Sequence, residues 1–333
     1  MTIKEIASES GYGVGTVSRV INNNGSVSDK ARARIMKVIE EHNYQPNENA
    51  KRLKIQSHYG IAVIVKGRSN ALFESVIERM HQAVQTKGYQ FIPYYIDQDD
   101  NEVEKAREIL NERNPYGIIF LGSNLEFFNK DYNISIPSVI VTADASELNL
   151  KNVSSVSVDD LRAASFMTDY LLDLGHKNIG VIGGNPDLSR PSSMRLIGVN
   201  SSFIKHRMNF DVNKNYAYGR FSLRGGYVAA RDLIKKFPDL TAIIAMSDLM
   251  AIGAIRALNE LGKKCPEDIS VTGFDGIEIA DYTVPGLTTI RQDADGLALR
   301  SVEILINSIE NGTEAVHEIV PYILKTGEST GKV

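Results

Sequence analysis

The chain has few of the features that mark secreted, membrane-bound or metal-dependent proteins. Its 333 residues include one cysteine, Cys265, which excludes an internal disulfide and is typical of a reducing cytosol. No apolar run approaches the roughly 18–20 residues of a membrane span, and the N-terminus lacks the apolar core of a secretion signal. The six histidines are scattered, without the spacing that holds a metal ion. These absences predict a cytoplasmic protein with no metal site.

Two glycine-rich segments imitate nucleotide-binding motifs without completing them. Residues 327–332 are one residue short of a phosphate-binding loop, lack the Ser or Thr after the lysine and leave no helix to follow. Residues 180–184 follow a predicted strand but make a poor dinucleotide fingerprint. No nucleophile or acid–base constellation accompanies them, so the sequence predicts neither an enzyme nor a bound cofactor.

Charge is distributed unevenly along the chain. The net charge is −4, yet residues 1–58 hold nine Lys or Arg against six Asp or Glu, which leaves the remainder strongly acidic. A cationic segment ahead of an anionic body suits polyanion binding at one end and self-repulsion elsewhere. The excess in the first segment is modest, so the placement of its charges matters more than their number.

Residues 2–54 have the pattern of a small DNA-reading module. A capping box at Thr2 and Glu5 begins the first predicted helix, and further helices are expected over residues 14–22 and 28–41. Two short helices at a steep angle plus a third make a helix-turn-helix, whose second helix enters the major groove. The residues of the second helix expected to face inward are Val17, Val20 and Ile21.

From residue 59 onward, short apolar runs alternate with helical segments. Buried strands separated by helices of ten to fifteen residues predict parallel sheets covered on both faces. The alternation restarts near residue 159, as a weak internal duplication that indicates two similar halves. The predicted fold is therefore a three-helix head followed by a two-part α/β body.

Four linked motifs resemble the lactose-repressor (LacI/GalR) family of bacterial transcription regulators in both order and spacing. The resemblance extends over essentially the whole chain and implies a body of two lobes like a type I periplasmic binding protein. The four motifs are Thr16-Val17-Ser18-Arg19-Val20-Ile21-Asn22, Val27-Ser28, Tyr44-Gln45-Pro46-Asn47 and Ala50-Lys51-Arg52-Leu53-Lys54.

The resemblance also implies where the domains meet. Three crossovers between the lobes are expected near residues 156–160, 284–290 and 314–320. The expected domains are the helix-turn-helix head at residues 1–46, a hinge helix and linker at 47–58, an N-terminal effector lobe at 59–158 with 288–316, and a C-terminal effector lobe at 159–287 with 317–333.

Arg19 is the strongest candidate for reading a base, because a guanidinium bridges both major-groove acceptors of a guanine. A phosphate contact or a solvated surface arginine is the alternative. Val14 and Gly15 occupy positions that the family uses for base specificity. Because both are small and apolar here, they favour contact with a thymine methyl or readout of DNA shape. The side chains expected to bind phosphate are those of Thr16, Ser18 and Asn22.

Further DNA contacts are expected at the start of the third helix and in the hinge. By resemblance, Leu53 wedges between central base pairs from the minor groove, with Asn47 and Lys54 near phosphates. The alternative for Leu53 is packing against the body. For Tyr44 the sequence is equally compatible with core packing and with a contact to a backbone phosphate. Ser28 is the last of the DNA-binding candidates.

In the body, the resemblance places ligand contacts where strand ends open toward the cleft between the lobes. A cation, a carboxylate and aromatic faces suit a polyhydroxylated ring, with hydrogen bonds at its edge and stacking on its face. The alternatives are that Asp275 caps a helix and that Phe73 and Phe221 belong to the core. The ligand-binding candidates are Asn70, Phe73, Asp144, Arg195, Phe221, Ser247 and Asp275.

The function implied is that of a homodimeric repressor at the bacterial nucleoid, whose affinity for double-stranded operator DNA changes when a sugar-like effector closes the lobes. The sequence leaves open which effector binds and whether it releases DNA. Three alternatives were weighed: a regulator driven by a protein corepressor, a transporter's solute-binding protein and a Rossmann-type enzyme. A regulator driven by a corepressor is disfavoured because the helix after Gln292 lacks the expected aromatic residue. The predicted DNA-binding head is evidence against a solute-binding protein, and the incomplete dinucleotide fingerprint is evidence against a Rossmann-type enzyme.

Overall fold

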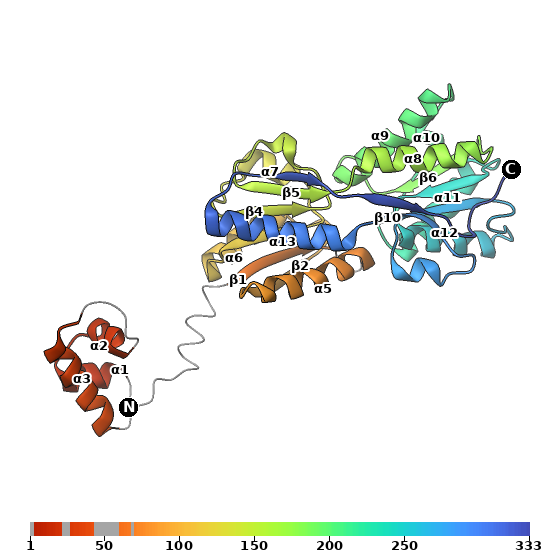
Figure 1. The fold of residues 1–333 in the computed structure, drawn as a ribbon. Helices are drawn as coiled ribbons and strands as arrows, with labels where there is room; N and C mark the ends of the chain where they lie inside the picture. The colour runs from red at the N-terminus through yellow and green to blue at the C-terminus, as the bar shows by residue number, and fades with distance from the viewer. Residues whose placement is uncertain (1–2, 22–26, 43–59, 68–69) are drawn as a thin grey trace. The chain divides into compact units, whose positions relative to one another are not determined.

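The chain divides into two compact units, a head of Met1–Ser57 and a body of His58–Val333 (Figure 1). The computed structural model describes residues 3–21, 27–42, 60–67 and 70–333. Within these ranges, no helix combines the length and apolarity that crossing a membrane requires.

The head consists of three short helices around a small apolar core. Ile6, Val17 and Ile35 are fully buried, one from each helix, and Val20 is almost so. The helical spacing of these residues brings one face of each helix to the centre. Of the residues predicted to face inward, Val17 and Val20 do so, whereas Ile21 is half-buried. The helices are α1 (Ile3–Ser10), α2 (Val14–Ile21) and α3 (Asp29–Glu41).

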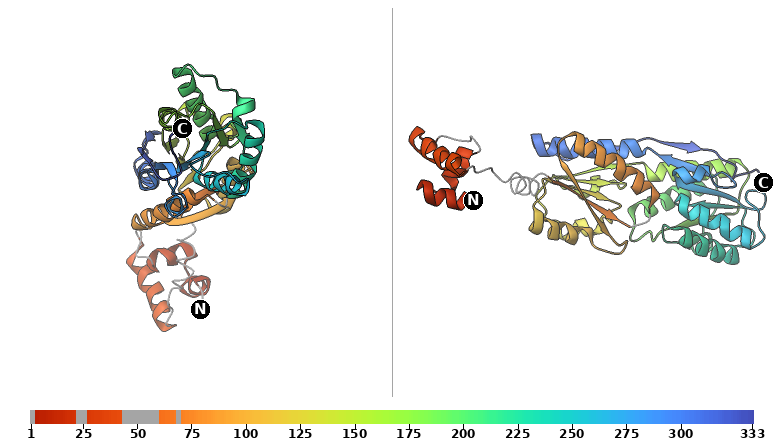
Figure 2. Two further views of the ribbon diagram at one scale, coloured as in Figure 1. Left: turned by 90° about the vertical axis from the view of Figure 1, so that its right-hand side faces the viewer. Right: turned by 90° about the horizontal axis from the view of Figure 1, so that it is seen from below.

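The first lobe of the body is a parallel sheet with helices on both faces. Helices α5 and α13 lie side by side on one face, and α6 covers the other (Figures 1 and 2). Alternate residues of β1 explain this, since Ile61 and Val63 contact the core under α5 while Ala62 and Ile64 contact the core under α6. The strand order is β11-β5-β4-β3-β1-β2. The elements are β1 (Gly60–Lys66), α5 (Ala71–Thr86), β2 (Gln90–Ile96), α6 (Glu102–Arg113), β3 (Gly117–Leu121), α7 (Glu126–Asp131), β4 (Ser138–Val141), η1 (Ser146–Leu148), β5 (Val153–Ser157), α13 (Ala294–Asn311) and β11 (His317–Ile319).

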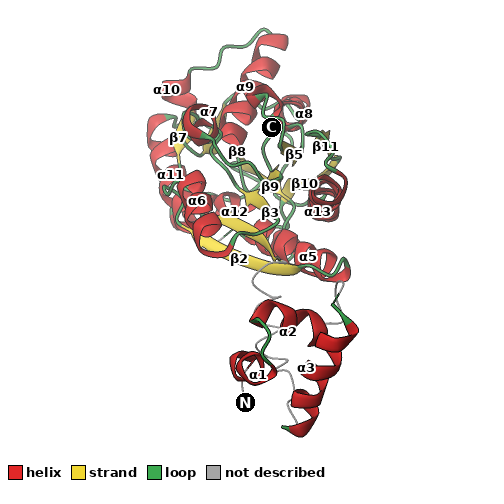
Figure 3. Cartoon of the chain, turned by 90° about the vertical axis from the view of Figure 1, so that its left-hand side faces the viewer, coloured by secondary structure: helices red, strands yellow, loops and turns green. Residues whose placement is uncertain are grey.

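The second lobe repeats this plan, with strands inside and helices outside (Figure 3). Its strand order is β12-β10-β9-β8-β6-β7, parallel throughout except that β12 runs antiparallel to β10. Helix α8 packs against α9, and α11 packs against α12. The elements are α8 (Asp160–Asp173), β6 (Ile179–Gly183), α9 (Arg190–Lys205), α10 (Val212–Asn215), β7 (Tyr216–Tyr218), α11 (Leu223–Lys236), β8 (Ala242–Ala245), α12 (Asp248–Glu260), β9 (Ser270–Asp275), η2 (Glu278–Asp281), β10 (Thr288–Gln292) and β12 (Tyr322–Lys325).

The chain passes between the lobes three times, and one of these passages lies outside its expected range. The first follows β5 at Ser157, within the predicted range. The second follows β10, which pairs with β9 and β12 and so belongs to the second lobe instead of returning to the first. The third follows β11 at Ile319, within the predicted range 314–320; because β11 pairs with β5, however, His317–Ile319 belongs to the first lobe and not to the second, as the expected domain boundary implied. A buried strand of either lobe has the same apolar pattern, so pairing decides where it belongs.

Candidate functional site

Helix α2 presents an outer face formed by the residues predicted to contact DNA. Its inner face is fixed by Val17 and Val20 in the head core, which directs the intervening positions outward. Val14, Gly15 and Arg19 are exposed, whereas Thr16 and Ser18 are half-buried. The exposed arginine and the two small residues thus share the surface of one helix, as a major-groove helix requires.

Ser28 has a structural role that the DNA-binding prediction did not include. Its side chain accepts a hydrogen bond from the backbone amide of Ala31 at 3.4 Å, so it caps the N-terminus of α3. The helix therefore begins at Asp29, one residue later than predicted. The remaining DNA-binding candidates lie outside the described residues, namely Asn22, Tyr44, Asn47, Leu53 and Lys54.

A cavity of about 450 Å³ lies between the two lobes of the body, and we call it the interlobe cavity. Parallel strands of both sheets end at it, so the first residues after each strand form much of its wall. The lining residues are Lys66, Gly67, Asn70, Leu72, Phe73, Asp97, Gln98, Asp99, Gly122, Ser123, Asn124, Thr142, Leu188, Ser189, Pro191, Arg195, Arg220, Phe221, Ser222, Asp275 and Gln292.

Five of the seven predicted ligand-binding residues line the interlobe cavity. They are Asn70, Phe73, Arg195, Phe221 and Asp275. Ser247 does not line it; its buried hydroxyl caps α12 by accepting a hydrogen bond from the amide of Met250 at 3.2 Å. Asp144 does not line it either, and its carboxylate accepts a hydrogen bond from the amide of Ser146 at 2.9 Å. The structure thus brings the cation, one carboxylate and both aromatic rings together.

Arg195 is held rigidly by groups of the second lobe. Its Nε donates to Asp160 Oδ1 at 2.8 Å, and its Nη1 donates to the carbonyl oxygen of Met246 at 2.6 Å. The guanidinium carbon lies 3.5 Å from the centroid of the Phe274 ring. Both partners of the ion pair are almost fully buried. Burial raises the pKa of Asp160, and the charge of Arg195 opposes that increase. The pairing leaves part of the guanidinium edge to face the cavity.

Asp275 is the last residue of β9. Its Oδ1 accepts a hydrogen bond from Gln292 Nε2 at 2.8 Å. Burial raises the pKa of Asp275 to about 7, while Arg195 and the hydrogen bond from Gln292 lower it. A buried carboxyl group near its titration point serves a ligand hydroxyl either as acceptor or, when protonated, as donor.

The loop that carries Asp275 is fixed by a second buried carboxylate. Asp248 Oδ2 accepts a hydrogen bond from the amide of Ile277 at 2.8 Å, and Oδ1 accepts one from the Thr289 hydroxyl. Burial, and then the charge of Asp275, raises the pKa of Asp248 well above its usual range. Asp275 itself has a φ of +117°, a conformation that non-glycine residues adopt only when their surroundings impose it. The local backbone is therefore set to point this carboxyl group.

The aromatic walls depend on glycines behind them. A Cβ atom at Gly122 would lie 2.6 Å from Cε2 of Phe73, and one at Gly184 would lie 2.5 Å from Cε2 of Phe221. Gly122 also has a φ of +86°, which disfavours any other residue. Both rings thus lie directly against backbone, so that each can present its other side to the cavity.

Two groups in the cavity wall were not found from the sequence. Lys66 ends β1 and donates to Glu102 Oε2 at 2.7 Å in a buried ion pair, and Glu102 Oε1 accepts from the amide of Asn124 at 2.6 Å. Gln292 ends β10, and its Oε1 is buried without a hydrogen-bond partner. The signal for both was present, since each is a polar residue at the last position of a buried strand. Within the described ranges, no group of three or more His, Cys, Asp or Glu is arranged to hold a metal ion.

Two ion pairs join the lobes at the rim of the cavity. Arg220 of the second lobe lies 3.4 Å from Asp99 of the first, and Arg190 of the second lies 2.8 Å from Glu147 of the first. The side chains of Arg220, Asp99 and Glu147 are largely exposed to solvent and that of Arg190 is half-buried, and contacts of this kind contribute roughly 0.2–1 kcal/mol each. Because each pair breaks when the lobes separate, the pairs favour the closed arrangement.

We expect Arg190→Glu to open the body, because two carboxylates would then face each other across the rim. The double variant E147R/R190E should restore the parent distance, since the pair is re-formed with its charges exchanged. The measurement is the spin-label distance between Gln82→Cys and Asn259→Cys, one on each lobe, in a Cys265→Ser background without ligand. Equal distance distributions in all three proteins would show that the rim charges do not affect closure.

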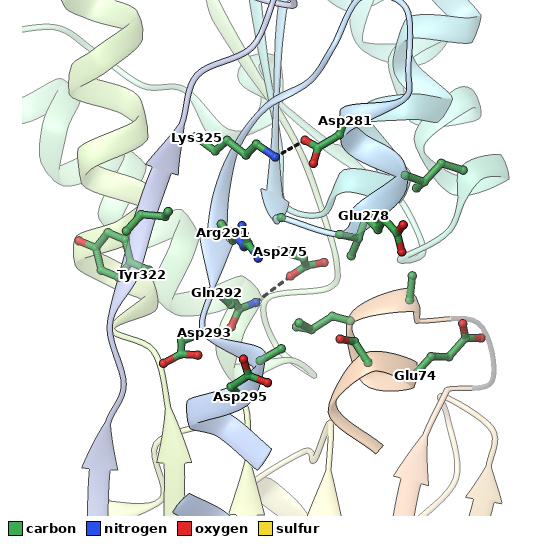
Figure 4. Close-up of a pocket in the computed structure, with 18 of the residues that line it drawn as sticks. Glu74, Asp275, Glu278, Asp281, Arg291, Gln292, Asp293, Asp295, Tyr322 and Lys325 are labelled. Atoms are coloured by element: carbon green, nitrogen blue, oxygen red, sulfur yellow. Dashed lines mark hydrogen bonds and ion pairs between the residues drawn. The ribbon is translucent and has the colours of Figure 1, made fainter. Parts of the chain in front are cut away.

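A second and larger cavity of about 1160 Å³ lies on another side of the junction between the lobes (Figure 4). It is bordered by the N-termini of α5 and α13, by η2 and by β12. Leu72, Asp275 and Gln292 belong to the walls of both cavities. The hydrogen bond between Asp275 and Gln292 is therefore shared by the two cavities. Acidic groups predominate around the larger one, including Glu74, Glu278, Asp281, Asp293 and Asp295.

Comparison with known proteins relates both units to one group of regulators. The sequence model for bacterial regulatory proteins of the lacI family matches residues 2–47, and that for a periplasmic binding protein-like domain matches residues 168–330. The HTH-type transcriptional regulator MalR of Clostridium butyricum is 34% identical over 327 residues, which are 96% of each chain. The ribose operon repressor of Haemophilus influenzae is 29% identical over 321 residues, which are 96% of this chain and 95% of the repressor.

The fold has a counterpart among solved structures. A transcriptional regulator CelR–cellobiose complex superposes with a TM-score of 0.73 and 26% sequence identity, covering 99% of both chains. The predicted fold class, a helix-turn-helix head with a two-lobed periplasmic-binding-protein-like body, is confirmed by these matches. The relatives named above are transcription regulators and not enzymes.

Proposed function

The chain belongs to the lacI family of bacterial regulatory proteins, and from that premise we propose that it is a repressor controlled by a sugar-like effector. The interlobe cavity carries the proposal, because it combines Arg195, Asp275 and two aromatic rings at the ends of parallel strands. The relatives named as a ribose operon repressor and as a CelR–cellobiose complex support a carbohydrate ligand. The roles of the individual ligand-binding residues belong to this proposal.

In the proposed mechanism, the effector shifts an existing equilibrium between open and closed lobes. It binds residues of both lobes, so it stabilises the closed state by the difference in its affinity for the two states. Because the chain crosses between the lobes three times, we expect closure of the lobes to affect the segment that leads to the head. Because linkage is reciprocal, DNA must then change effector affinity by the same factor as the effector changes DNA affinity.

We propose that the repressor acts as a homodimer on a near-palindromic operator in the cytoplasm. One α2 helix offers few base contacts, so two heads are needed for useful affinity, and operator symmetry follows from that of the protein. Exposed apolar side chains support a partner surface on the second lobe. Ile279 is 54% exposed, Tyr282 78% and Val284 93%. Exposed apolar residues on monomers usually occur singly, so three of them within six residues support a contact with a partner.

Selection from randomised DNA tests the proposed function without a known operator. The full chain should enrich a near-palindromic duplex, and the enriched duplex should lose or gain affinity when a sugar that stabilises the protein is added. Arg19→Ala should weaken binding to this duplex by about 1–3 kcal/mol and relax the base preference at one position of each half-site. Lys30→Ala, at an exposed position of α3, is the control for a change of charge alone. Unchanged selectivity of Arg19→Ala would remove its assigned role, and the absence of any enriched duplex would refute DNA reading.

A further inference from the structure

A smaller cavity continues the interlobe cavity toward the rim, and we call it the side cavity. Its volume is about 400 Å³, close to that of the interlobe cavity itself. The two share Asn124, Leu188 and Ser189 in their walls, so they are adjacent compartments of one groove. The side cavity ends at the Arg190–Glu147 ion pair.

The cationic side chains of the groove are already paired with carboxylates of the protein. Four described lining residues are cationic, and each is within ion-pair distance of a protein carboxylate. The pairs are Lys66–Glu102 at 2.7 Å, Arg195–Asp160 at 2.8 Å, Arg220–Asp99 at 3.4 Å and Arg190–Glu147 at 2.8 Å. Further carboxylates line the groove at Asp97, Asp275, Glu126 and Asp187. An anionic ligand would meet excess negative charge and would have to displace a carboxylate from its cation.

The groups that remain are acceptors and donors for hydroxyl groups. Gln292, which lines the interlobe cavity and the larger one, has a buried Oε1 without a partner, and an unsatisfied buried oxygen costs about 1–3 kcal/mol until a donor reaches it. The side cavity is lined by the acidic residues Glu126 and Asp187 together with Leu125 and Leu148. Each compartment thus offers polar groups together with an apolar surface, the combination that one sugar ring requires.

We propose that the effector is a neutral saccharide of two rings, with one ring between Phe73 and Phe221 and the other in the side cavity. This inference rests on the proposed function and adds the size and the charge of the ligand. Contact of the second ring with residues 124–126 of the first lobe and residues 186–193 of the second places it across the rim. The second ring therefore adds to the force that closes the lobes.

Calorimetric titration of the full chain with matched sugars tests the proposal. The probes are glucose, maltose, cellobiose and trehalose, with glucose 6-phosphate and trehalose 6-phosphate as their anionic counterparts. At least one disaccharide should bind about tenfold or more tightly than glucose, the equivalent of about 1.4 kcal/mol for the second ring. Both phosphates should bind more weakly than the corresponding neutral sugars. Tighter binding of a phosphate, equal binding of glucose and the best disaccharide, or no binding by any probe would overturn the proposal.

Two variants that fill the side cavity from opposite walls separate its role from folding. Ser193→Phe on α9 and Leu148→Trp on η1 should each reduce disaccharide affinity about tenfold or more and leave glucose affinity unchanged. The matched control is Ser201→Phe, an exposed position on the same helix as Ser193 and outside both cavities. Melting temperatures without sugar report on folding. Parent-like disaccharide binding by folded Ser193→Phe and Leu148→Trp would show that the second ring lies elsewhere.

The same protein samples distinguish this inference from the proposed function. Enrichment of a palindromic duplex without binding of any probe sugar would leave the DNA-binding role intact and overturn the two-ring ligand. Disaccharide binding that is sensitive to Ser193→Phe, without enrichment of any duplex, would refute the repressor and support the groove.

Discussion

Replacing Arg195 by methionine is expected to abolish effector binding and to destabilise the body by about 3–5 kcal/mol at neutral pH. The substitution keeps the length and much of the volume of the side chain but leaves Asp160 buried without its cation. A buried carboxylate that loses its partner must be desolvated without compensation or take up a proton. Urea unfolding measures the loss of stability, and titration with the tightest-binding probe sugar measures the loss of affinity.

A double variant separates the two roles of Arg195. Asp160→Asn removes the stranded charge, so R195M/D160N should regain most of the stability that R195M loses. It should not regain effector affinity, because the guanidinium edge that faces the cavity is still missing. The exposed variant Arg162→Met, whose partner Asp159 is 3.2 Å away at the surface, should cost less than about 1 kcal/mol. If R195M/D160N bound sugar as the parent does, Arg195 would be a folding residue and not a ligand-binding one.

Much of the fold follows from local patterns in the sequence. The helices α2 and α3 begin within one residue of the predicted positions, because their apolar spacing and caps are local signals. Strand β5 was not predicted, since Val153–Ser157 contains three serines and no long apolar run. Hydrogen bonds explain the burial of two of them: the amide of Ala145 donates to the hydroxyl of Ser155, and the amide of Val316 donates to that of Ser154. Such a strand depends on partners far along the chain, which a local pattern does not reveal.

The assignment of strands to lobes has the same limit. Thr288–Gln292 was predicted as part of the first lobe, yet β10 inserts between β9 and β12 of the second. Thr288–Gln292 contains a single apolar residue, Ile290, so its local sequence does not favour either sheet, and only pairing and the position of the next helix distinguish them. The chain changes lobes at Asp293, which caps α13 by accepting a hydrogen bond from the amide of Gly296 at 2.9 Å.

The sequence predicted the site residues whose positions the resemblance supplied. It predicted less well the residues whose side-chain orientation depends on packing. Arg195 and Asp275 lie on the cavity wall as the resemblance implied, although their role in binding remains a prediction. Ser247 lies close to the end of a strand, as Lys66 does, but its side chain caps α12. Gln292 was passed over because its position depends on β10 ending at the cavity. Local hydrogen bonds therefore decide whether a polar side chain near the end of a strand faces a ligand.

We expect the stability of the body to fall as the pH rises toward 8, and Asp275→Asn to reduce that fall. Burial raises the pKa of Asp275 from 3.8 to about 7 in the folded chain, so between about pH 4 and 7 the folded state holds a proton that the unfolded state has released. The folded state binds more protons in this window, and stability therefore decreases with increasing pH. Asp248, whose pKa is raised by burial and by the charge of Asp275, acts in the same direction.

The variant Asp275→Asn keeps an oxygen that accepts the hydrogen bond from Gln292 and tolerates the positive φ, but it has no charge to desolvate. Relative to the parent, its melting temperature should be higher by at least about 2–4 °C at pH 8, the change produced by 1 kcal/mol in a domain of this size, and nearly equal at pH 5. Asp295→Asn, an exposed carboxylate 69% accessible to solvent, is the control and should show no such dependence on pH. Because each comparison is made with the parent at the same pH, the titration of carboxylates that do not interact with Asp275 cancels. A difference between Asp275→Asn and the parent that is the same at pH 5 and pH 8 would mean that Asp275 is ionised throughout, and that it meets ligand hydroxyls only as an acceptor.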